Sequence, residues 1–457
     1  MKTIFIPVSK DIMRRNILDT TFWSHYRSLN PGVKTVLIVE NGKKDFYQAR
    51  FGVEEEGVYI EEFVKYKDGF ARKVLLSLIR NGIRSHSTTL YRWRSYQMKQ
   101  VGLLMTLFKS LLSFTLARTD WYKSFLRYLA LNIKQPVQFE NMFDSHNPDM
   151  IFALSLIDTN VDAPIAIIAK QRDIPVIGMV RSWDNLNNHG LLSVIPDIFL
   201  LQNKWLERTL SLFQGINVGD VDSKIVGLPH YDIYKNPANV LNPRNEFLRA
   251  LDLDPEKKLI YITGFDFYFS EDRLPALVNS FIEDGVLDMP SQVFFTQHPS
   301  SPFKKEDYGI ENCEHVTYYN FFCSPERFLD TDTFFINLMS HADVVINVTS
   351  TVSIDCAVLD RPAICINFDS ADKKLPKWQK VERLFDHFDH YEQLVSMDGV
   401  DVVHSSSELK DSINRYLHNP EYKKEGRRAI VDEFVAPFDG GAGCRLAEVV
   451  SNEITKI

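Results

Sequence analysis

Cysteine is scarce and unpatterned in this chain of 457 residues. The five cysteines lie far apart and form no Cys-X-X-Cys pair (Cys313, Cys323, Cys356, Cys365 and Cys444). An odd number leaves at least one thiol unpaired, which argues against a disulfide framework and against a zinc ribbon. We therefore expect buried thiols in a reducing compartment.

Long hydrophobic runs are also missing. No stretch reaches the roughly 18 consecutive apolar residues that a transmembrane helix needs. The N-terminus, MKTIFIPVSKD, starts directly as a strand and lacks the apolar core and cleavage site of a signal peptide. The sequence therefore predicts a cytoplasmic protein without a membrane span. Its net charge of −8 argues against nucleic acid as a partner.

The length and the order of apolar segments favour an α/β protein with two domains. A chain of 457 residues exceeds what a single core holds and suits two domains of about 200 residues. Apolar strands are predicted at residues 3–8, 34–40, 150–156 and 258–263, with helical segments between them. This alternation is typical of doubly wound parallel sheets.

One segment, residues 342–369, combines a buried strand with a cluster of hydroxyl groups. Its sequence is ADVVINVTSTVSIDCAVLDRPAICINFD. The β-branched run at 344–348 predicts a strand buried on both faces, and Ser350 and Thr351 stand before a short predicted helix. Free amides, hydroxyls and the helix dipole make such a place suitable for an anion. An ordinary capped helix would use the same residues, so both interpretations stay open.

A second polar segment, RSWDNLNNHG at residues 181–190, directly follows a predicted buried strand. Open α/β sheets bind ligands at the carboxyl ends of their strands. A desolvated carboxylate or imidazole there can take a proton from a hydroxyl group, so Asp184 and His189 are the candidate catalytic bases. A buried Trp beside an Asx-turn would explain part of the segment structurally. Further candidates are Arg181, Trp183 and Asn185 for the cleft, and Asp158 and His230 as weaker bases.

Residues 72–134 are strongly basic, with twelve Lys and Arg residues and one acidic residue, Asp120. Helical apolar runs such as VGLLMTLFKSLLSF lie between the charges, together with Trp and Tyr residues. Such segments lie on anionic membrane surfaces or hold anionic lipid-linked molecules. The alternative is a solvated helical insertion whose apolar face packs on the sheet.

These segments resemble motifs of GT-B glycosyltransferases that build bacterial surface polysaccharides. Residues 342–369 are similar to the donor-side signature of that branch, and residues 181–190 to its SWDN loop. The segment VGLPHYD at 226–232 resembles the end of a GT-B first domain, and PFDGGAGCR at 437–445 resembles a PLDGxAxxR segment with Phe438 in place of Leu. The branch is distantly similar to CDP-glycerol glycerophosphotransferases and to the UDP-GlcNAc 2-epimerase fold.

The resemblance implies an α/β protein of GT-B type, with two Rossmann-like domains facing across a cleft. We expect an acceptor-side domain at residues 1–250, with the basic helical insertion at about 72–134, and a nucleotide-sugar donor domain at 251–420. The helices at 421–457 are expected to cross back to the first domain.

The resemblance also assigns site residues. Ser350 and Thr351 should face the donor diphosphate, and Asp355 the ribose or sugar hydroxyls. Gly264 should bring backbone close to the donor, and His298-Pro299 matches the HP of an R-x-HP motif, with Thr296 in place of its Arg. Asp439 and Arg445 are expected to form a structural or donor-site pair. No metal is implied, and no cofactor beyond the nucleotide-sugar co-substrate.

The function implied is a metal-independent glycosyltransferase that moves a sugar from a nucleotide-activated donor to a cell-surface glycan such as O-antigen or capsule. The acceptor is expected to be lipid-linked, with residues 72–134 making peripheral contact at the inner face of the cytoplasmic membrane. Two alternatives remain: a CDP-glycerol-type polyol-phosphate transferase, and a non-catalytic nucleotide-sugar-binding assembly protein.

Overall fold

The computed structural model describes residues 1–52, 57–264, 273–298, 301, 304–320, 331–369 and 374–457. Within them the chain forms two compact units, each built around its own parallel sheet. The first unit comprises residues 1–92, 101–235 and 433–457, and the second comprises residues 93–100 and 236–432. The chain thus leaves the first unit twice, for the short stretch 93–100 and again after Lys235, and returns the second time at Glu433.

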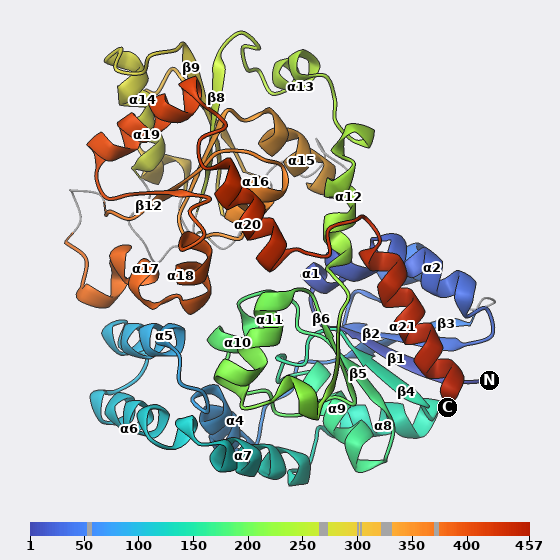
Figure 1. Cartoon of the computed structure of the whole chain (residues 1–457). Coiled ribbons are helices and arrows are strands. Elements are labelled where there is room, and N and C mark those ends of the chain that lie inside the picture. The colour runs from blue at the N-terminus through green and yellow to red at the C-terminus, as the bar shows by residue number, and fades with distance from the viewer. Residues whose placement is uncertain (53–56, 265–272, 299–300, 302–303, 321–330, 370–373) are drawn as a thin grey trace. The chain divides into compact units, whose positions relative to one another are not determined.

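The sheet of the first unit has seven strands in the order β3-β2-β1-β4-β5-β6-β7. All neighbouring strands are parallel. Its residues alternate between two hydrophobic clusters, with Phe5 on one face and Ile4 and Ile6 on the other, so helices cover both faces (Figure 1). The strands are β1 (Thr3–Val8), β2 (Lys34–Glu40), β3 (Val58–Phe63), β4 (Met150–Ala153), β5 (Val176–Gly178), β6 (Ile198–Leu201) and β7 (Asp222–Ile225).

Helices of the first unit connect these strands and include the basic segment as an insertion between β3 and β4. The connecting helices are α1 (Asp11–Met13), α2 (Thr21–Leu29), α3 (Lys44–Phe51), α8 (Val137–His146), α9 (Asp162–Gln171), α10 (Asn185–Asn188), α11 (Lys204–Thr209) and α12 (Asp232–Lys235). The insertion forms α4 (Phe70–Arg80), α5 (His86–Gln97), α6 (Leu103–Phe114) and α7 (Asp120–Asn132), of which the end of α5, from Trp93, groups with the second unit. The predicted helical character of residues 72–134 is confirmed.

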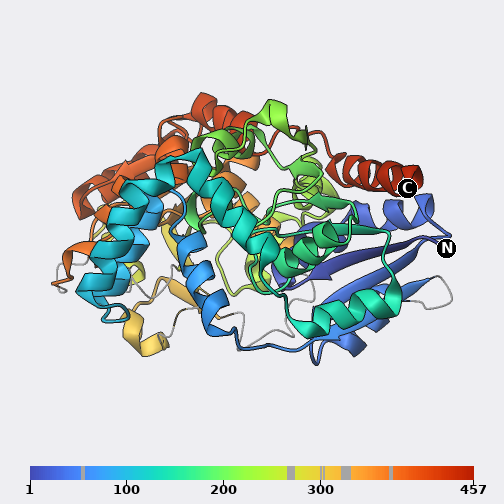
Figure 2. The ribbon, with the colours of Figure 1, turned by 90° about the horizontal axis from the view of Figure 1, so that it is seen from below.

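The last helix, α21 (Ala442–Lys456), packs against α2 in the first unit. The Asp232 carboxylate accepts hydrogen bonds from the amides of Ala442 and Gly443 at 3.0 and 2.8 Å, which caps the start of α21. At the other end, Lys2 Nζ donates to the Ile454 carbonyl at 3.0 Å. The two termini therefore lie side by side, as both views show (Figures 1 and 2).

The sheet of the second unit has six parallel strands in the order β10-β9-β8-β11-β12-β13. The strands are β8 (Lys258–Thr263), β9 (Ser291–Thr296), β10 (Val316–Tyr319), β11 (Val344–Asn347), β12 (Ala363–Ile366) and β13 (Asp401–Val403). The helices are α13 (Arg244–Ala250), α14 (Leu274–Glu283), α15 (Thr331–His341), α16 (Val352–Val358), α17 (Glu382–His387), α18 (Asp389–Val395), α19 (Ser406–His418) and α20 (Lys424–Phe434), the last of which runs to the point of return.

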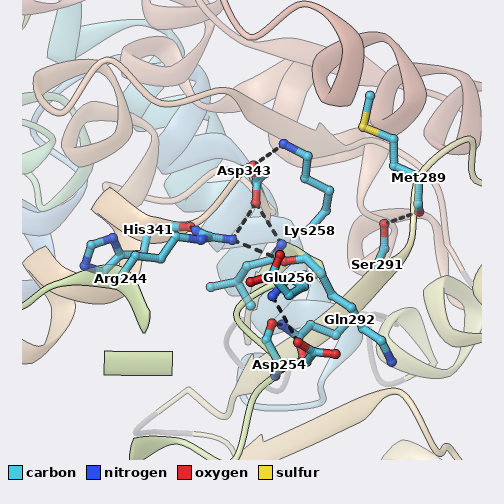
Figure 3. A network of polar contacts seen from close by, with 11 residues as sticks. Arg244, Asp254, Glu256, Lys258, Met289, Ser291, Gln292, His341 and Asp343 are labelled. Atoms are coloured by element: carbon cyan, nitrogen blue, oxygen red, sulfur yellow. Dashed lines mark hydrogen bonds and ion pairs between the residues drawn. The ribbon is translucent and has the colours of Figure 1, made fainter. Parts of the chain in front are cut away.

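A polar network closes the amino-terminal edge of the second sheet (Figure 3). Asp343, just before β11, accepts hydrogen bonds from Arg244 Nη2 at 3.1 Å and from Lys258 Nζ at 2.9 Å. It also accepts one from the Leu259 amide at 2.8 Å. The carboxylate and the two cations satisfy one another, so this edge ties strands β8 and β11 together, while the opposite, carboxyl edge carries the features described below.

The predicted fold class is confirmed, since both units are Rossmann-like α/β units with parallel sheets. The strands at 3–8, 34–40 and 258–263 have the predicted bounds. By its contacts the first unit runs to Lys235 and resumes at Glu433, and the domain bounds given from sequence stay predictions. Within the described residues, no helix combines the length and the apolar character that crossing a membrane requires.

Candidate functional site

The first sheet changes direction of winding between β1 and β4, and two pockets open at the carboxyl ends of these strands. Ligands bind at such switch points in doubly wound sheets. The larger pocket has a volume of about 510 Å³, within the usual size of small-molecule sites. It is lined by Ser9, Lys10, Asp11, Glu40, Lys43, Phe63, Lys65, Tyr66, Asp158, Asn160 and Val161.

Two carboxyl groups meet at the base of this pocket around the Ser9 hydroxyl. Ser9 Oγ lies 3.2 Å from Asp158 Oδ2 and 3.1 Å from Asp162 Oδ2. Asp162 is fully buried, and burial together with the charge of Asp158 raises its pKa well above the usual value. A proton on Asp162 can therefore be donated to Ser9, whose own hydrogen then points to Asp158. The remaining oxygen of Asp158 accepts from the amides of Asn160 and Val161 at 2.8 and 3.2 Å.

The smaller pocket, of about 170 Å³, adjoins the first because Lys10, Asp158 and Asn160 line both. Arg80 at the end of α4, Arg181 and His189 also line it. The His189 pKa is lowered by burial and by the charges of Arg181, Lys10 and Arg80, while Asp184 opposes the shift. His189 is therefore a neutral imidazole at neutral pH, in a form that can accept a proton.

The segment 181–190 divides into pocket and core residues. Arg181 and His189 line the smaller pocket. Trp183 is 5% exposed and packs edge-on against Phe434 at a ring distance of 5.0 Å. Asp184 accepts hydrogen bonds from the side chains of Asn185 and Asn188 at 3.1 and 3.0 Å and lies 3.9 Å from His189 Nε2. Asp184 and Asn185, like Trp183, line neither pocket, so they shape the loop that presents His189.

Gly190 explains how Arg80 reaches this pocket. Its φ is +99°, and a Cβ there would lie 2.7 Å from the Arg80 Cα. Only glycine allows the loop to approach the end of α4 this closely. His230, a weaker candidate base, lines neither pocket; burial lowers its pKa to about 3, and its ring packs against Tyr231 and Tyr234.

The second sheet has its own switch point between β8 and β11. The last residues of these paired strands are Thr263 and Asn347, and both are buried. Thr263 Oγ1, Asn347 Nδ2 and Thr349 Oγ1 are buried atoms without a hydrogen-bond partner among the described residues. Thr349 also has a φ of +26°, a strained conformation for a β-branched residue. Unsatisfied buried groups and backbone strain concentrate at functional sites, so this edge is the candidate ligand site of the second unit.

The predicted donor-site residues lie along this same edge, after three neighbouring strands. Gly264 follows β8, and a Cβ there would lie 2.6 Å from the His298 amide nitrogen after β9. Ser350, after β11, receives a hydrogen bond at its Oγ from the Val352 amide at 3.3 Å. Thr351 is exposed and Asp355 is half-buried within α16. Pro299 lies outside the described residues.

Asp439 and Arg445 form a two-pronged ion pair with N–O distances of 2.8 and 2.6 Å. Arg445 Nε also donates to the Val226 carbonyl at 3.1 Å, which joins the segment before α21 to the end of β7. Arg445 holds the Asp439 pKa below its usual value. Neither residue lines the two pockets of the first unit, and the pair braces the returning chain.

Lys10, Arg80, Asp162 and Thr349 were not among the residues predicted from sequence. The position of Lys10 could have indicated a binding residue, since it stands two residues after β1 at the switch point. The position of Arg80 could not, because it reaches the pocket from an inserted helix through the contact at Gly190.

Comparison with known proteins gives structural similarity only. No family profile matches the chain, and no curated protein matches its sequence. The putative UDP-N-acetylglucosamine 2-epimerase of Listeria monocytogenes is 11% identical with a TM-score of 0.57, covering 100% of this chain and 98% of that one. MnaA of S. aureus, solved with UDP, is 10% identical with a TM-score of 0.55 and covers 100% and 98%. The UDP-GlcNAc 2-epimerase of Neisseria meningitidis, bound to UDP-GlcNAc, is 11% identical with a TM-score of 0.54 and covers 99% and 100%.

The chain has the GT-B fold. The similarity covers both units of each chain rather than one sheet alone. At 10–11% sequence identity this similarity shows the fold and not the reaction, which depends on the residues of this GT-B chain itself.

Proposed function

We propose that the chain is a glycosyltransferase that moves a sugar from a nucleotide-activated donor to a hydroxyl group of a cell-surface glycan, of the O-antigen or capsule type. The observation that carries the proposal is the β8/β11 switch point, where three buried polar atoms have no hydrogen-bond partner among the described residues, beside a glycine in close backbone contact. A nucleoside diphosphate group offers the acceptor oxygens that such donors require.

The donor would bind to the second unit, with its diphosphate at the loop after β11. The hydroxyls of Ser350 and Thr351, the amides of that loop and His298 would stabilise the phosphate charge, and Asp355 would bind ribose or sugar hydroxyls. The Listeria, S. aureus and Neisseria proteins are named for UDP-GlcNAc chemistry or were solved with UDP, which makes a UDP-linked sugar the first donor to test.

The acceptor would bind to the first unit across the two adjoining pockets, with His189, which lines the smaller one, as the base. The acceptor oxygen attacks the anomeric carbon of the donor sugar, its proton passes to the neutral His189 ring, and the bond from that carbon to the donor phosphate breaks. The nucleoside diphosphate leaves with the electron pair, and its charge is stabilised by the donor-binding groups.

Removing two hydroxyls tests the donor site. We expect Ser350→Ala combined with Thr351→Val to weaken the Kd for a UDP-sugar by about tenfold or more, because two hydrogen bonds to charged oxygens are lost. Isothermal titration with UDP-, GDP-, TDP-, CDP- and CMP-linked donors measures it. Ser406→Ala combined with Ser407→Ala, two exposed hydroxyls on α19, is the control. Equal donor affinity in the wild type and the first double variant would refute this placement.

Products separate the competing activities. A polyol-phosphate transferase would transfer glycerol phosphate from CDP-glycerol, and a binding protein would hold donor without transfer or hydrolysis. An epimerase would change the donor sugar with no acceptor present, and the epimerase structures among the similar proteins make this control necessary.

A membrane contact of the first unit belongs to the same proposal and rests on α6, whose apolar residues point outward. Leu104, Phe108 and Leu111 follow one another at helical spacing and are 84%, 55% and 63% exposed. Thr106 and Ser113 of the same helix are buried instead, with exposures of 0% and 2%. This is the reverse of a helix that faces water, and exposed apolar patches of this kind mark contact surfaces.

Basic and aromatic side chains surround this face, which favours an anionic lipid surface as its partner. Arg84 and Arg118 lie over the Phe114 ring at 4.8 and 4.4 Å, and Trp121 on α7 is 62% exposed. Trp beside Arg and Lys anchors proteins at the membrane interface. We therefore propose that the reaction takes place at the inner face of the cytoplasmic membrane, where a lipid-linked acceptor would be found.

Vesicle sedimentation tests the membrane contact. We expect the wild type to bind vesicles of phosphatidylcholine and phosphatidylserine, and Leu104→Ser combined with Leu111→Ser to bind at least about 100-fold more weakly, because each buried leucine contributes about 1.5–3 kcal/mol. Leu29→Ser combined with Leu212→Ser is the control, since these leucines are 45% and 63% exposed elsewhere on the first unit. Equal losses in both double variants, or no binding by the wild type, would contradict the proposal.

A further inference from the structure

The 170 Å³ pocket of the first unit gathers cations without neutralising them. Lys10, Arg80 and Arg181 line it, and Asp158 is the one carboxylate in its lining. Within the part of the chain that the structure describes, none of the three cations forms an ion pair or donates a side-chain hydrogen bond. Like charges at close range repel, so a site that keeps three of them together unpaired is organised for an anion.

Asp158, the carboxylate in the lining, does not neutralise the three cations. Both oxygens of Asp158 already accept hydrogen bonds, one from the Asn160 and Val161 amides and the other within range of Ser9 Oγ. The three cations come from three separate elements: Lys10 from the loop after β1, Arg80 from the end of α4 and Arg181 from the segment after β5. This is the arrangement that surrounds a compact, multiply charged group, and two of the three are arginines, which bind phosphate with paired N–H donors.

The volumes indicate how much of a ligand the pocket holds. At about 170 Å³ it is smaller than the roughly 300–1,000 Å³ of ordinary ligand sites, so it suits one charged group rather than a whole sugar. The adjoining 510 Å³ pocket is large enough for a sugar, and Lys10, Asp158 and Asn160 belong to both. A molecule spanning the two would place its neutral part in one and its anionic group in the other.

We infer that the Lys10–Arg80–Arg181 pocket binds a phosphate group carried by the acceptor. The identification of the ligand as the acceptor rests on the proposed function, whereas the anion site itself does not. This names a substrate class: the acceptor is a phosphate ester or diester whose phosphate binds in the smaller pocket, whose neutral part extends into the larger one, and whose reacting hydroxyl faces His189. Lys10, Arg80 and Arg181 are then positioning residues for transfer.

Anion binding can be followed through the pKa of His189, whose ring lines the same pocket. The three cations depress the pKa of His189, and an anion bound among them cancels part of that effect. Binding therefore raises the His189 pKa, and by linkage the affinity for the anion rises as His189 becomes protonated. His189 is the one histidine in the lining of this pocket, so its ring signal reports on this site.

Inorganic sulfate, a tetrahedral dianion across the relevant pH range, is the probe. The full chain carries twelve histidines, and the ring signal of His189 in ¹³C-labelled protein is assigned by its loss in His189→Asn. We expect sulfate to raise the His189 pKa relative to chloride at equal ionic strength. Arg80→Met combined with Arg181→Met should lower the sulfate affinity by about tenfold or more and raise the His189 pKa in the absence of sulfate. Lys73→Met, an exposed cation on α4 that lines neither pocket, should match the wild type.

Three outcomes would overturn the inference. Sulfate would leave the His189 pKa unchanged, the double Arg variant would bind as the wild type does, or Lys73→Met would lose as much affinity as that variant. Hexyl phosphate and hexanoate then distinguish phosphate from carboxylate: we expect the phosphate to bind about tenfold more tightly, and equal binding would overturn the assignment to phosphate. The double Arg variant should unfold at the wild-type temperature or above, since it removes unpaired like charges, so a loss of binding is not a loss of folding.

This titration contains no donor and measures no transfer. A negative result would therefore leave the glycosyltransferase proposal standing, and a failure of donor binding at the second unit would leave a positive sulfate result standing.

Discussion

Replacing His189 with asparagine is expected to lower kcat for sugar transfer by about 10²–10⁴-fold, the usual contribution of a general base. The neutral ring lines the smaller pocket of the first unit, and the Asp184 carboxylate lies 3.9 Å from its Nε2. Asparagine keeps a polar side chain of similar size but cannot take up a proton at neutral pH. Donor affinity, measured by titration, should be unchanged because the donor is assigned to the other unit.

The pH dependence of transfer gives this prediction a second readout. Burial and the neighbouring cations lower the His189 pKa below its ordinary value of 6.5. The base is active when unprotonated, so kcat/KM should rise with pH through that lowered pKa and level off above it. Asp184→Asn removes the neighbouring charge that opposes this shift, so the acidic limb should move to still lower pH.

His418→Asn is the matched control, because His418 is an exposed histidine of α19 that pairs with Asp288. It should leave kcat and the pH profile as they are. A His189→Asn enzyme that kept about a third or more of the wild-type kcat would remove His189 as the base and leave Asp158, which lines both pockets, as the next candidate.

The central strands of both sheets could be predicted from sequence, and the edge strands could not. β1, β2 and β8 are uninterrupted apolar runs because helices cover both of their faces. β3, β10 and β13 lie at sheet edges, and their sequences VYIEEF, VTYY and DVV are short or mixed with polar residues. An edge strand is partly exposed, so its pattern differs little from that of a loop.

Site residues next to a predicted strand could be found from the sequence, and site residues brought in by contacts between distant segments could not. Ser350 and Thr351 stand directly after a predicted strand, and His189 belongs to the polar segment 181–190 that follows another, so the chain alone marks these places as the carboxyl edge of a sheet. Arg80 lies more than a hundred residues before His189, in an inserted helix, and only the packing of Gly190 against its backbone brings the two together. Spacing in the sequence carries no record of such a contact. Trp183 illustrates the converse, since its place in a polar motif suggested the cleft and its ring packs on Phe434.

Gly264 is weak evidence for a binding site in the sequence, but in the structure it is a position where a side chain does not fit. Its Cα faces the backbone of β9, so an added Cβ would lie 2.6 Å from the His298 amide nitrogen and 2.9 Å from the Thr296 carbonyl oxygen. Backbone atoms cannot rotate away as a flexible side chain does. Gly264→Ala therefore has to separate β8 and β9 just where Gly264 N donates to the Thr296 carbonyl at 2.7 Å.

We expect Gly264→Ala to lower the free energy of unfolding by about 1–3 kcal/mol, the usual cost of overpacking, as measured by urea denaturation. The same displacement moves His298 away from the donor, and a shift of about 1 Å can cost about 10²-fold in activity. Gly32→Ala is the control, since a Cβ on Gly32 meets no atom within 4 Å. If Gly264→Ala kept both the stability and the donor affinity of Gly32→Ala, the close approach of the two backbones would not be what positions the donor. Loss of donor affinity beyond the loss of stability would instead tie this glycine, through His298, to phosphate binding at the β8/β11 switch point.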